Sequence, residues 1–265
     1  MFKILKERFH QGYRTMAYPQ GPPPPLPDRF VGMPELAAAP CPEGCRACEE
    51  ACPTEAIRFD GSKPQLDLGR CLFCVDCVQA CPEGSISFTA DYRMAASRRE
   101  DFHLAPDQAL RLAGALDAKL LNLFGRSLKL RQVSAGGCNA CEADVNVLGT
   151  PGWDLGRFGI QMVASPRHAD GLLVTGCVTE NMKVALEKAY AAVAPPKLVI
   201  AVGACAISGG PFLGNAQTLG GAASVVPVDL YIPGCPPHPL TILDGLLRLL
   251  GRLEESRDTR PTPKS

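Results

Sequence analysis

The sequence predicts two domains in series, a small α+β domain followed by a doubly wound α/β domain built around a parallel sheet. Three observations lead to this prediction. The length of 265 residues suits two domains of ordinary size. Many of the 13 cysteines lie in two compact groups between residues 41 and 81. Beyond them, apolar runs of strand length alternate with runs of helix length.

Composition and charge narrow the range of functions. The 27 Lys+Arg residues balance the 27 Asp+Glu residues, which disfavours a nucleic-acid binder that depends on bulk electrostatics. No apolar run approaches the roughly 18 residues of a membrane span, and the N-terminus lacks the apolar region of a secretory signal. We therefore expect no transmembrane helix, and a reducing compartment in which the cysteines bind metal rather than form disulfides.

Residues 1–35 are expected to form an amphipathic helix and a proline-rich strap. Phe2, Leu5, Phe9 and Tyr13 fall on one helical face, and basic residues occupy the other. The helix packs either on a protein surface or at a membrane interface, and the pattern leaves both open. The prolines that follow favour an extended polyproline-II segment.

The domain expected at residues 36–101 is defined by its cysteines. The second group fits the spacing C-x2-C-x2-C-x3-C-P, and the first has one extra residue after its first cysteine. This doubled order is the bacterial two-cluster ferredoxin pattern, in which the fourth cysteine of each group binds the other cluster. We therefore predict a ferredoxin-like fold with two [4Fe–4S] clusters rather than zinc sites or disulfides. The predicted ligands are Cys41, Cys45, Cys48 and Cys81 for cluster 1, and Cys52, Cys71, Cys74 and Cys77 for cluster 2.

Two short apolar pairs follow the cysteine groups at equivalent offsets, Ile57 with Phe59 and Ile86 with Phe88. We expect them to form paired strands that cover the clusters and limit their exposure to solvent, which influences the reduction potential.

Residues 102–126 are expected to form a helical linker that begins after Pro106 and carries an apolar stripe ending at Phe124. The tail at residues 254–265 is charged and contains proline, so we expect it to be disordered.

The domain expected at residues 127–253 has runs rich in Val, Ile and Leu without polar alternation, as in parallel strands buried on both faces. Helical runs between them imply βαβ units and a flavodoxin-like order of strands. The strands are expected at 127–133, 160–164, 171–175, 198–202 and 225–232, and the helices at 142–148, 179–193 and 240–253.

The remaining cysteines all follow expected strands. They are Cys138, Cys141, Cys177, Cys205 and Cys235. In an open α/β sheet, ligand sites gather outside the carboxyl ends of the strands, so these cysteines can converge on one further cluster. Spacing does not decide which four bind it, and a free cysteine such as Cys177 is equally typical of a buried core.

Five motifs carry a family resemblance. They are Cys138-Asn-Ala-Cys141-Glu142, Arg157-Phe-Gly159, Ala164-Ser-Pro-Arg-His-Ala-Asp170, Gly203-Ala-Cys205 and Val228-Asp-Leu-Tyr-Ile-Pro-Gly-Cys-Pro-Pro237. Residues 127–250 thereby resemble the small electron-transfer subunit shared by complex I, as its 20 kDa subunit, and the membrane-bound group 4 [NiFe] hydrogenases. The resemblance implies Cys138, Cys141, Cys205 and Cys235 as the ligands of cluster 3, a [4Fe–4S] cluster. Complex I has adjacent cysteines at the first two positions, so the Cys-x-x-Cys spacing here resembles the hydrogenase branch.

The first part of the chain has a resemblance of its own. Met1-Phe-Lys, the segment Arg29-Phe-Val-Gly-Met-Pro34 and both cysteine groups are similar to the two-cluster ferredoxin subunit of formate hydrogenlyase and the 23 kDa subunit of complex I. In those complexes the two proteins are separate neighbours, so this chain resembles a fusion of them.

The resemblance implies an oxidoreductase subunit that relays electrons through three [4Fe–4S] clusters in a group 4 [NiFe] hydrogenase or formate-hydrogenlyase-type complex. The chemistry would take place in a catalytic large subunit, and no flavin or nucleotide is expected in this chain. The other implied partners are membrane-arm subunits and an upstream electron donor, and the implied location is peripheral, on the cytoplasmic face of the inner membrane. One alternative is a complex-I-like protein that reduces quinone beside a partner without nickel, and another is a standalone ferredoxin.

No acid–base pair or nucleophile is evident in the sequence. Glu142 is a weak candidate for a proton path, and its position at a helix start suits a structural role equally. Arg167 and His168 are candidates for tuning the potential of cluster 3, with a structural loop pair as the alternative. We expect Trp153 to lie in the core or at an interface.

Overall fold

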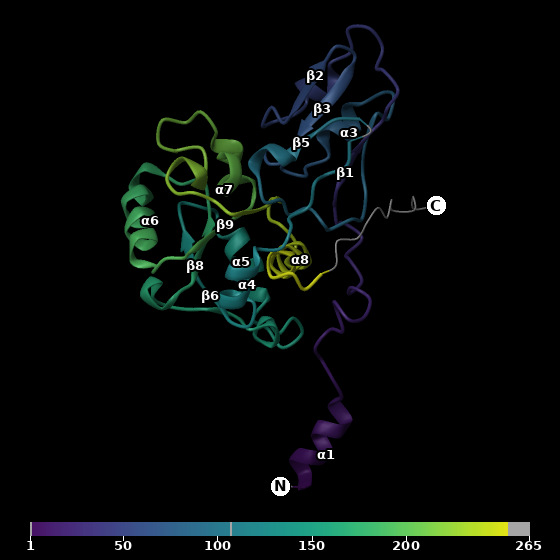
Figure 1. The fold of residues 1–265 in the computed structure, drawn as a ribbon. Coiled ribbons are helices and arrows are strands. Elements are labelled where there is room, and N and C mark those ends of the chain that lie inside the picture. Colours follow the sequence, from purple (N-terminus) through teal and green to yellow (C-terminus); the bar gives the residue numbers. More distant parts are fainter. Residues whose placement is uncertain (1, 107, 254–265) are drawn as a thin grey trace.

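The computed structural model describes residues 2–106 and 108–253. Met1, Asp107 and the tail expected at 254–265 lie outside the described residues. Figure 1 shows a small first domain beside a larger α/β domain, with helix α1 (Phe2–Gln11) standing away from both.

The first domain is built of short elements that frame the cysteine loops. They are β1 (Pro34–Leu36), α2 (Ala47–Glu50), β2 (Ile57–Asp60), β3 (Lys63–Asp67), α3 (Asp76–Ala80), β4 (Ile86–Phe88), η1 (Arg99–Phe102) and β5 (His103–Leu104). Strands β2, β3 and β5 form one antiparallel sheet, and β1 pairs with β4 in another.

The expectation that the two apolar pairs form strands paired with each other is wrong, because β2 and β4 lie in different sheets. Strand β2 turns back on β3 through a two-residue connection in which Gly61 adopts a φ of 61°, a conformation that glycine accepts readily. The strap supplies β1 as the partner of β4. Each strand therefore finds a neighbour other than the one predicted.

The second domain has one parallel sheet with the strand order β10-β9-β8-β6-β7. Its elements are α4 (Ala118–Phe124), β6 (Leu128–Ser134), α5 (Ala140–Val147), η2 (Leu155–Phe158), β7 (Ile160–Met162), η3 (Pro166–His168), β8 (Gly171–Thr175), α6 (Glu180–Ala192), β9 (Leu198–Val202), α7 (Ala204–Ser208), η4 (Gly210–Phe212), η5 (Ala222–Ser224), β10 (Leu230–Ile232) and α8 (Pro239–Leu249). The chain passes from β6 to the edge strand β7 and then to β8 on the other side of β6. This order agrees with a flavodoxin-like sheet.

Several elements are shorter than the sequence predicts, most of all β10 and the linker helix. Strand β10 begins only at Leu230, because Pro227 lacks the amide that a strand interior requires. In the linker, helix α4 begins only at Ala118, and the segment before it is extended. The amides of Ala113 and Leu116 there bond to the carbonyl oxygens of Ala95 and Leu249, which replace the bonds of a helix.

The helices cover both faces of the sheet. Buried residues of α5 and α8 pack on one face, and those of α6 and α7 pack on the other. Helix α8 is buried along its whole length and includes the polar residues Thr241, Asp244 and Arg248.

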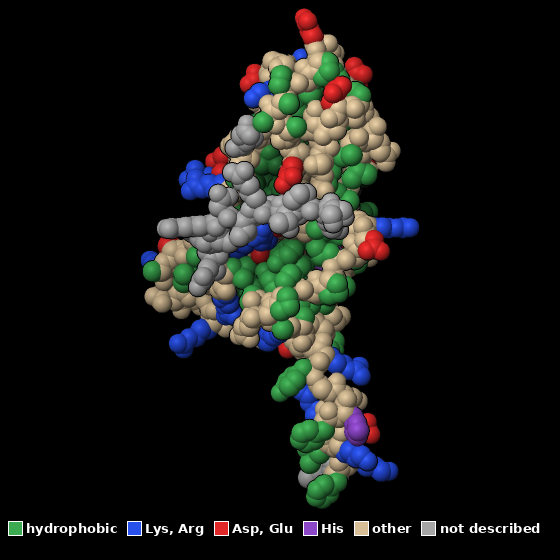
Figure 2. All heavy atoms as spheres, turned by 90° about the vertical axis from the view of Figure 1, so that its right-hand side faces the viewer, with side chains coloured by type: hydrophobic (Ala, Val, Ile, Leu, Met, Phe, Trp, Pro, Cys, Tyr) green, Lys and Arg blue, Asp and Glu red, His purple; other side chains and the backbone are tan. Residues whose placement is uncertain are grey.

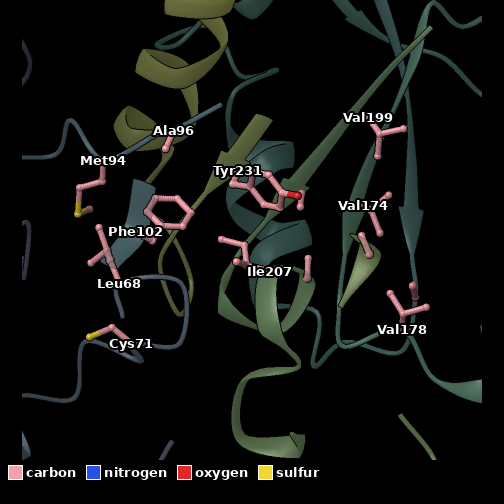
Figure 3. Packing of buried hydrophobic residues seen from close by; sticks show 14 of the residues in the cluster. Leu68, Cys71, Met94, Ala96, Phe102, Val174, Val178, Val199, Ile207 and Tyr231 are labelled. Carbon is pink, nitrogen blue, oxygen red and sulfur yellow. The ribbon is translucent and has the colours of Figure 1, made fainter. Parts of the chain in front are cut away.

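The two domains share a continuous core at the edge of the sheet that β10 forms. Phe102 of the first domain meets Tyr231 of β10 edge to face, with ring centroids 6.3 Å apart, and Figure 3 shows Leu68 and Ile207 beside them. Ala96 and Tyr231 exchange two backbone hydrogen bonds at 3.0 and 2.9 Å, which adds a bridge to the sheet. The cysteine loops of both domains are therefore held in one rigid arrangement.

Candidate functional site

The four cysteines predicted for cluster 2 line one small cavity between α3 and strand β2. Burial raises the pKa of Cys71 to about 12, and the neighbouring thiols of Cys77, Cys52 and Cys74 act in the same direction. Backbone amides point at the sulfurs: Phe73 N lies 3.3 Å from Cys71 Sγ. These thiols repel one another as anions, which is the arrangement that a cationic metal centre would stabilise.

The set predicted for cluster 1 is brought together less completely. Burial raises the pKa of Cys48 to about 11, with contributions from the thiols of Cys81 and Cys41. Cys45 lies in the same loop, half-buried, with its amide bonded to a backbone carbonyl. Burial also acts on Cys81, but the amide of Ser85, 3.2 Å from its sulfur, helps to lower the pKa of that thiol overall.

The loops reach these positions through unusual backbone conformations. Phe73 and Val75 between the cluster 2 cysteines have φ values of 57° and 62°. A β-branched residue such as valine rarely adopts this region, and such strain is typical of functional loops. Here it lets amides turn toward the sulfur atoms.

The cysteines implied for cluster 3 follow three strands at the carboxyl end of the sheet, with Cys141 and Cys205 in the first turns of α5 and α7 and the others in loops. The pKa of Cys141 is raised to about 12, mainly by burial. The neighbouring groups Cys205, Glu142, Cys235 and Cys138 raise it as well. A Cβ atom on Gly203 would lie 2.6 Å from Cys141 Sγ, so only glycine fits beside this sulfur. The sequence indicates such close approach, although not which glycine provides it.

Cys177 lies behind this set. Its side chain is 2% exposed, and its Sγ donates to the carbonyl oxygen of Gly136 at 3.4 Å. Cys177 is also a neighbour of Cys205, since it contributes to the raised pKa of that thiol. This geometry favours Cys177 as a core residue.

The three cysteine sets are neighbours in series. Among the neighbours that raise the pKa of Cys77 is Cys48 of the first set. Among those that raise the pKa of Cys235 is Cys74 of the second set. The second set therefore lies near both of the others, and Cys74 and Cys235 are neighbours across the domain boundary.

Glu142 is held as a buried carboxylate. Its Oε1 accepts hydrogen bonds from Ser134 Oγ and Thr175 Oγ1, both at 2.6 Å. Burial raises its pKa, but these two hydroxyls outweigh burial, so the net pKa is lowered. The carboxylate thus ties the ends of β6 and β8 to the start of α5. The pairing with Ser134 and Thr175 could not be predicted from the sequence, because it joins loops distant along the chain.

The structure does not bring Arg167 and His168 close to the cysteines. Both side chains are exposed on η3, beside the start of β6. Asp170 exchanges hydrogen bonds with the backbone of Lys129 there, near the amino end of the strand. A tuning role for either residue stays a prediction without support from this geometry. Trp153 is half-buried and meets His238 edge-on, at a centroid distance of 6.0 Å.

The donor chemistry fits iron–sulfur clusters. Among the described residues, no three Cys, His, Asp or Glu side chains converge tightly enough to hold a single metal ion. A cubane needs four thiolates spread around a larger body, with amides directed at its sulfurs. The loops around Cys71 meet both requirements, and the residues around Cys141 meet the first. None of the described helices combines the length and apolar character needed to cross a membrane.

Comparison with known proteins agrees with this arrangement. Residues 41–85 match the 4Fe-4S dicluster domain, and residues 138–249 match the family "NADH ubiquinone oxidoreductase, 20 Kd subunit". Formate hydrogenlyase subunit 7 of Escherichia coli K12 is 44% identical over 55% of this chain and 57% of its own length. The chain thus spans a little over half of that relative.

This chain covers a larger share of the length of two further relatives. A Pyrococcus furiosus protein named as a probable membrane-bound hydrogenase subunit is 41% identical over 51% of this chain and 81% of its own length. An NADH-quinone oxidoreductase subunit of Phocaeicola vulgatus is 44% identical over 52% of this chain and 69% of its own length. The chain therefore belongs to the NADH ubiquinone oxidoreductase 20 Kd subunit family, with a 4Fe-4S dicluster domain ahead of the family domain in the same polypeptide.

Proposed function

We propose that this chain is the electron-transfer subunit of a membrane-associated oxidoreductase complex of the group 4 [NiFe] hydrogenase or formate-hydrogenlyase type. The observation that carries the proposal is the proximity of the three cysteine sets in series, in which Cys48 lies near Cys77 and Cys74 lies near Cys235. Three [4Fe–4S] clusters held there would supply one-electron carriers in series. The chain's own residues hold the clusters, shield them and fix their spacing.

The first and the last of the three cysteine sets have different surroundings, which suit different partners. Cys138 and Cys235 of the cluster 3 set are exposed, so this end is open to a catalytic large subunit. At the other end, the surface around cluster 1 carries acidic side chains such as Glu43, Glu50 and Glu83. An upstream electron donor with a basic surface would fit there.

Metal analysis tests the number of clusters. The purified chain is expected to contain about twelve iron atoms and about twelve labile sulfides, four of each for every cubane. A value near eight in an intact, anaerobic preparation would contradict the third cluster.

The second candidate is a complex-I-like protein whose last cluster reduces quinone. The equal identity to a formate hydrogenlyase subunit and to an NADH-quinone oxidoreductase subunit favours it as much as the hydrogenase. The spacing of Cys138 and Cys141 favours the hydrogenase. Nickel analysis of the purified complex distinguishes the two, because only the hydrogenase contains this metal in its large subunit.

We further propose that α1 attaches the complex to the cytoplasmic face of the inner membrane. Phe2 and Phe9 are 89% and 87% exposed, and no residue of this helix is buried. Figure 2 shows its hydrophobic side chains next to basic ones, well away from the body of the protein. An apolar stripe with basic flanks fits the surface of an anionic bilayer.

Replacing Phe2, Leu5 and Phe9 together with serine is expected to move most of the complex from washed membranes into the supernatant. The apolar stripe then has nothing to bury in the lipid. A double variant of Glu7 and His10 to serine, on the same helix, is the control and should stay with the membranes. Full retention of the triple variant would show that other subunits alone attach the complex.

A further inference from the structure

The strap, defined here as residues 15–33, begins on the second domain although it precedes the first domain in the chain. Met16 N donates to the carbonyl oxygen of Gly152 at 2.9 Å. The guanidinium of Arg157 donates to the carbonyl oxygens of Met16 and Tyr18, both at 2.6 Å. The start of the strap is thus bound to the loops around η2.

Tyr18 makes the deepest contact of this segment. Its side chain is 6% exposed, and its hydroxyl donates to Asp244 Oδ1 at 3.1 Å. Asp244 is fully buried in the middle of α8 and also accepts from Arg248 Nε at 2.7 Å. The Tyr18 ring meets Tyr92 of the first domain edge to face, with centroids 6.1 Å apart. Burial holds the pKa of Tyr18 far above its ordinary value, so the hydroxyl keeps its proton and remains a donor.

The middle of the strap forms one wall of a cleft of about 340 Å³ between the cysteine loops of clusters 2 and 3. Arg29, Phe30 and Val31 of the strap line this cleft together with Phe73 and Cys235. The Phe30 ring also meets His238 edge-on, with centroids 5.4 Å apart. The strap therefore contacts the residue next to the cluster 3 loop and forms one wall of the cleft between the two sets.

The end of the strap is bound to the first domain. Gly32 N donates to Thr89 O at 3.0 Å, and Met33 N donates to Asp91 O at 2.8 Å. Strand β1 then continues along β4. The strap runs from the second domain, past the gap between the clusters, to the first domain.

A buried charge on an otherwise apolar helix calls for a reason, because its desolvation is costly and an apolar replacement would pack as well. Fixing a geometry is one such reason, since a satisfied buried network defines a single arrangement. Electron tunnelling falls steeply with the distance between two carriers. We propose that Asp244 is a positioning residue that acts through Tyr18 on the strap and so fixes the separation of clusters 2 and 3. The proposal rests on the proposed electron relay.

The test uses the full chain in its complex, purified anaerobically and fully reduced. Tyr18→Phe removes only the hydroxyl and keeps the buried ring. Arg157→Gln is a second variant that releases the strap carbonyls without touching α8. The matched control is Tyr13→Phe, since the Tyr13 side chain is 92% exposed. Iron content, the electron paramagnetic resonance splitting between clusters 2 and 3, and the rate of electron transfer between them are measured for each.

We expect both strap variants to keep the iron content of the unmodified chain, to show a weaker and broader splitting, and to transfer electrons several-fold more slowly. The control should match the unmodified chain. A lower melting temperature with unchanged splitting and rate would show that the contacts of the strap with the second domain serve stability alone. This result would overturn the proposal. Absence of splitting in the unmodified chain would instead contradict the relay itself, and with it the positioning role.

Discussion

Replacing Cys235 with serine is expected to lower the iron content from about twelve to about eight atoms per chain, because a cubane that loses one of four thiolates is poorly held. Cys235 follows β10 in a loop that leaves its side chain exposed. The splitting between clusters 2 and 3 should disappear with the cluster. Iron analysis and electron paramagnetic resonance of the reduced chain measure both effects.

Cys177→Ser is the matched control for this experiment. Cys177 lies in the same domain and also follows a strand, but its Sγ is turned to the carbonyl oxygen of Gly136. A serine hydroxyl donates to the same carbonyl, so the iron content should remain near twelve. Loss of four irons from Cys177→Ser, with full iron retained in Cys235→Ser, would show that the implied ligand set is wrong.

Replacing Arg248 with methionine is expected to reduce the free energy of unfolding by about 3–5 kcal/mol, because it leaves the buried Asp244 carboxylate without its cationic partner. At about 2–4 °C per kcal/mol, Tm should fall by roughly 10 °C. Arg248 is 7% exposed at its side chain and Asp244 is 1% exposed, so solvent cannot replace the lost partner. Anaerobic thermal unfolding, followed by the visible absorption of the clusters, measures the change.

Two controls separate the burial of this pair from the mere loss of a charge. Arg98→Met breaks an ion pair with Glu100 in which both side chains are more than 60% exposed, so its effect should stay below about 1 kcal/mol. The double variant Asp244→Leu, Arg248→Met, combined with Tyr18→Phe to remove the hydroxyl that bonds to Asp244, should regain most of the lost stability, since apolar groups of similar volume replace the polar ones. A combined variant as unstable as Arg248→Met would contradict this explanation.

The cysteine spacing and the apolar periodicity carry different kinds of information. Thiolate ligands need fixed local spacings, and these are visible in the sequence around Cys71 and Cys74. The parallel strands are also visible, and Leu198–Val202 has the bounds predicted, because strands buried on both faces are continuously apolar. Pairing is not visible, since β4 pairs with a strand from the strap rather than with β2.

The contacts that join the domains cannot be predicted from the sequence either, for a different reason. Arg157 stands out in the sequence only as part of a motif, yet its guanidinium binds two carbonyl oxygens of the strap. Every residue has a backbone carbonyl group, so the sequence does not show which carbonyl oxygens accept these bonds. Asp244 and Arg248 do offer a signal, because two opposite charges four residues apart interrupt an apolar helix, and such a pair indicates a buried partner. Its third member, Tyr18, is too far along the chain to be linked to them by pattern.

The distance between those residues along the chain has a consequence for biosynthesis. The bond from Tyr18 to Asp244 joins positions 226 residues apart. During translation Tyr18 is made well before its acceptor on α8. The contact between the strap and α8 can form only after Asp244 has been made. The strap therefore reaches its final position on the second domain after the loops that carry Cys71 and Cys235 have been synthesised.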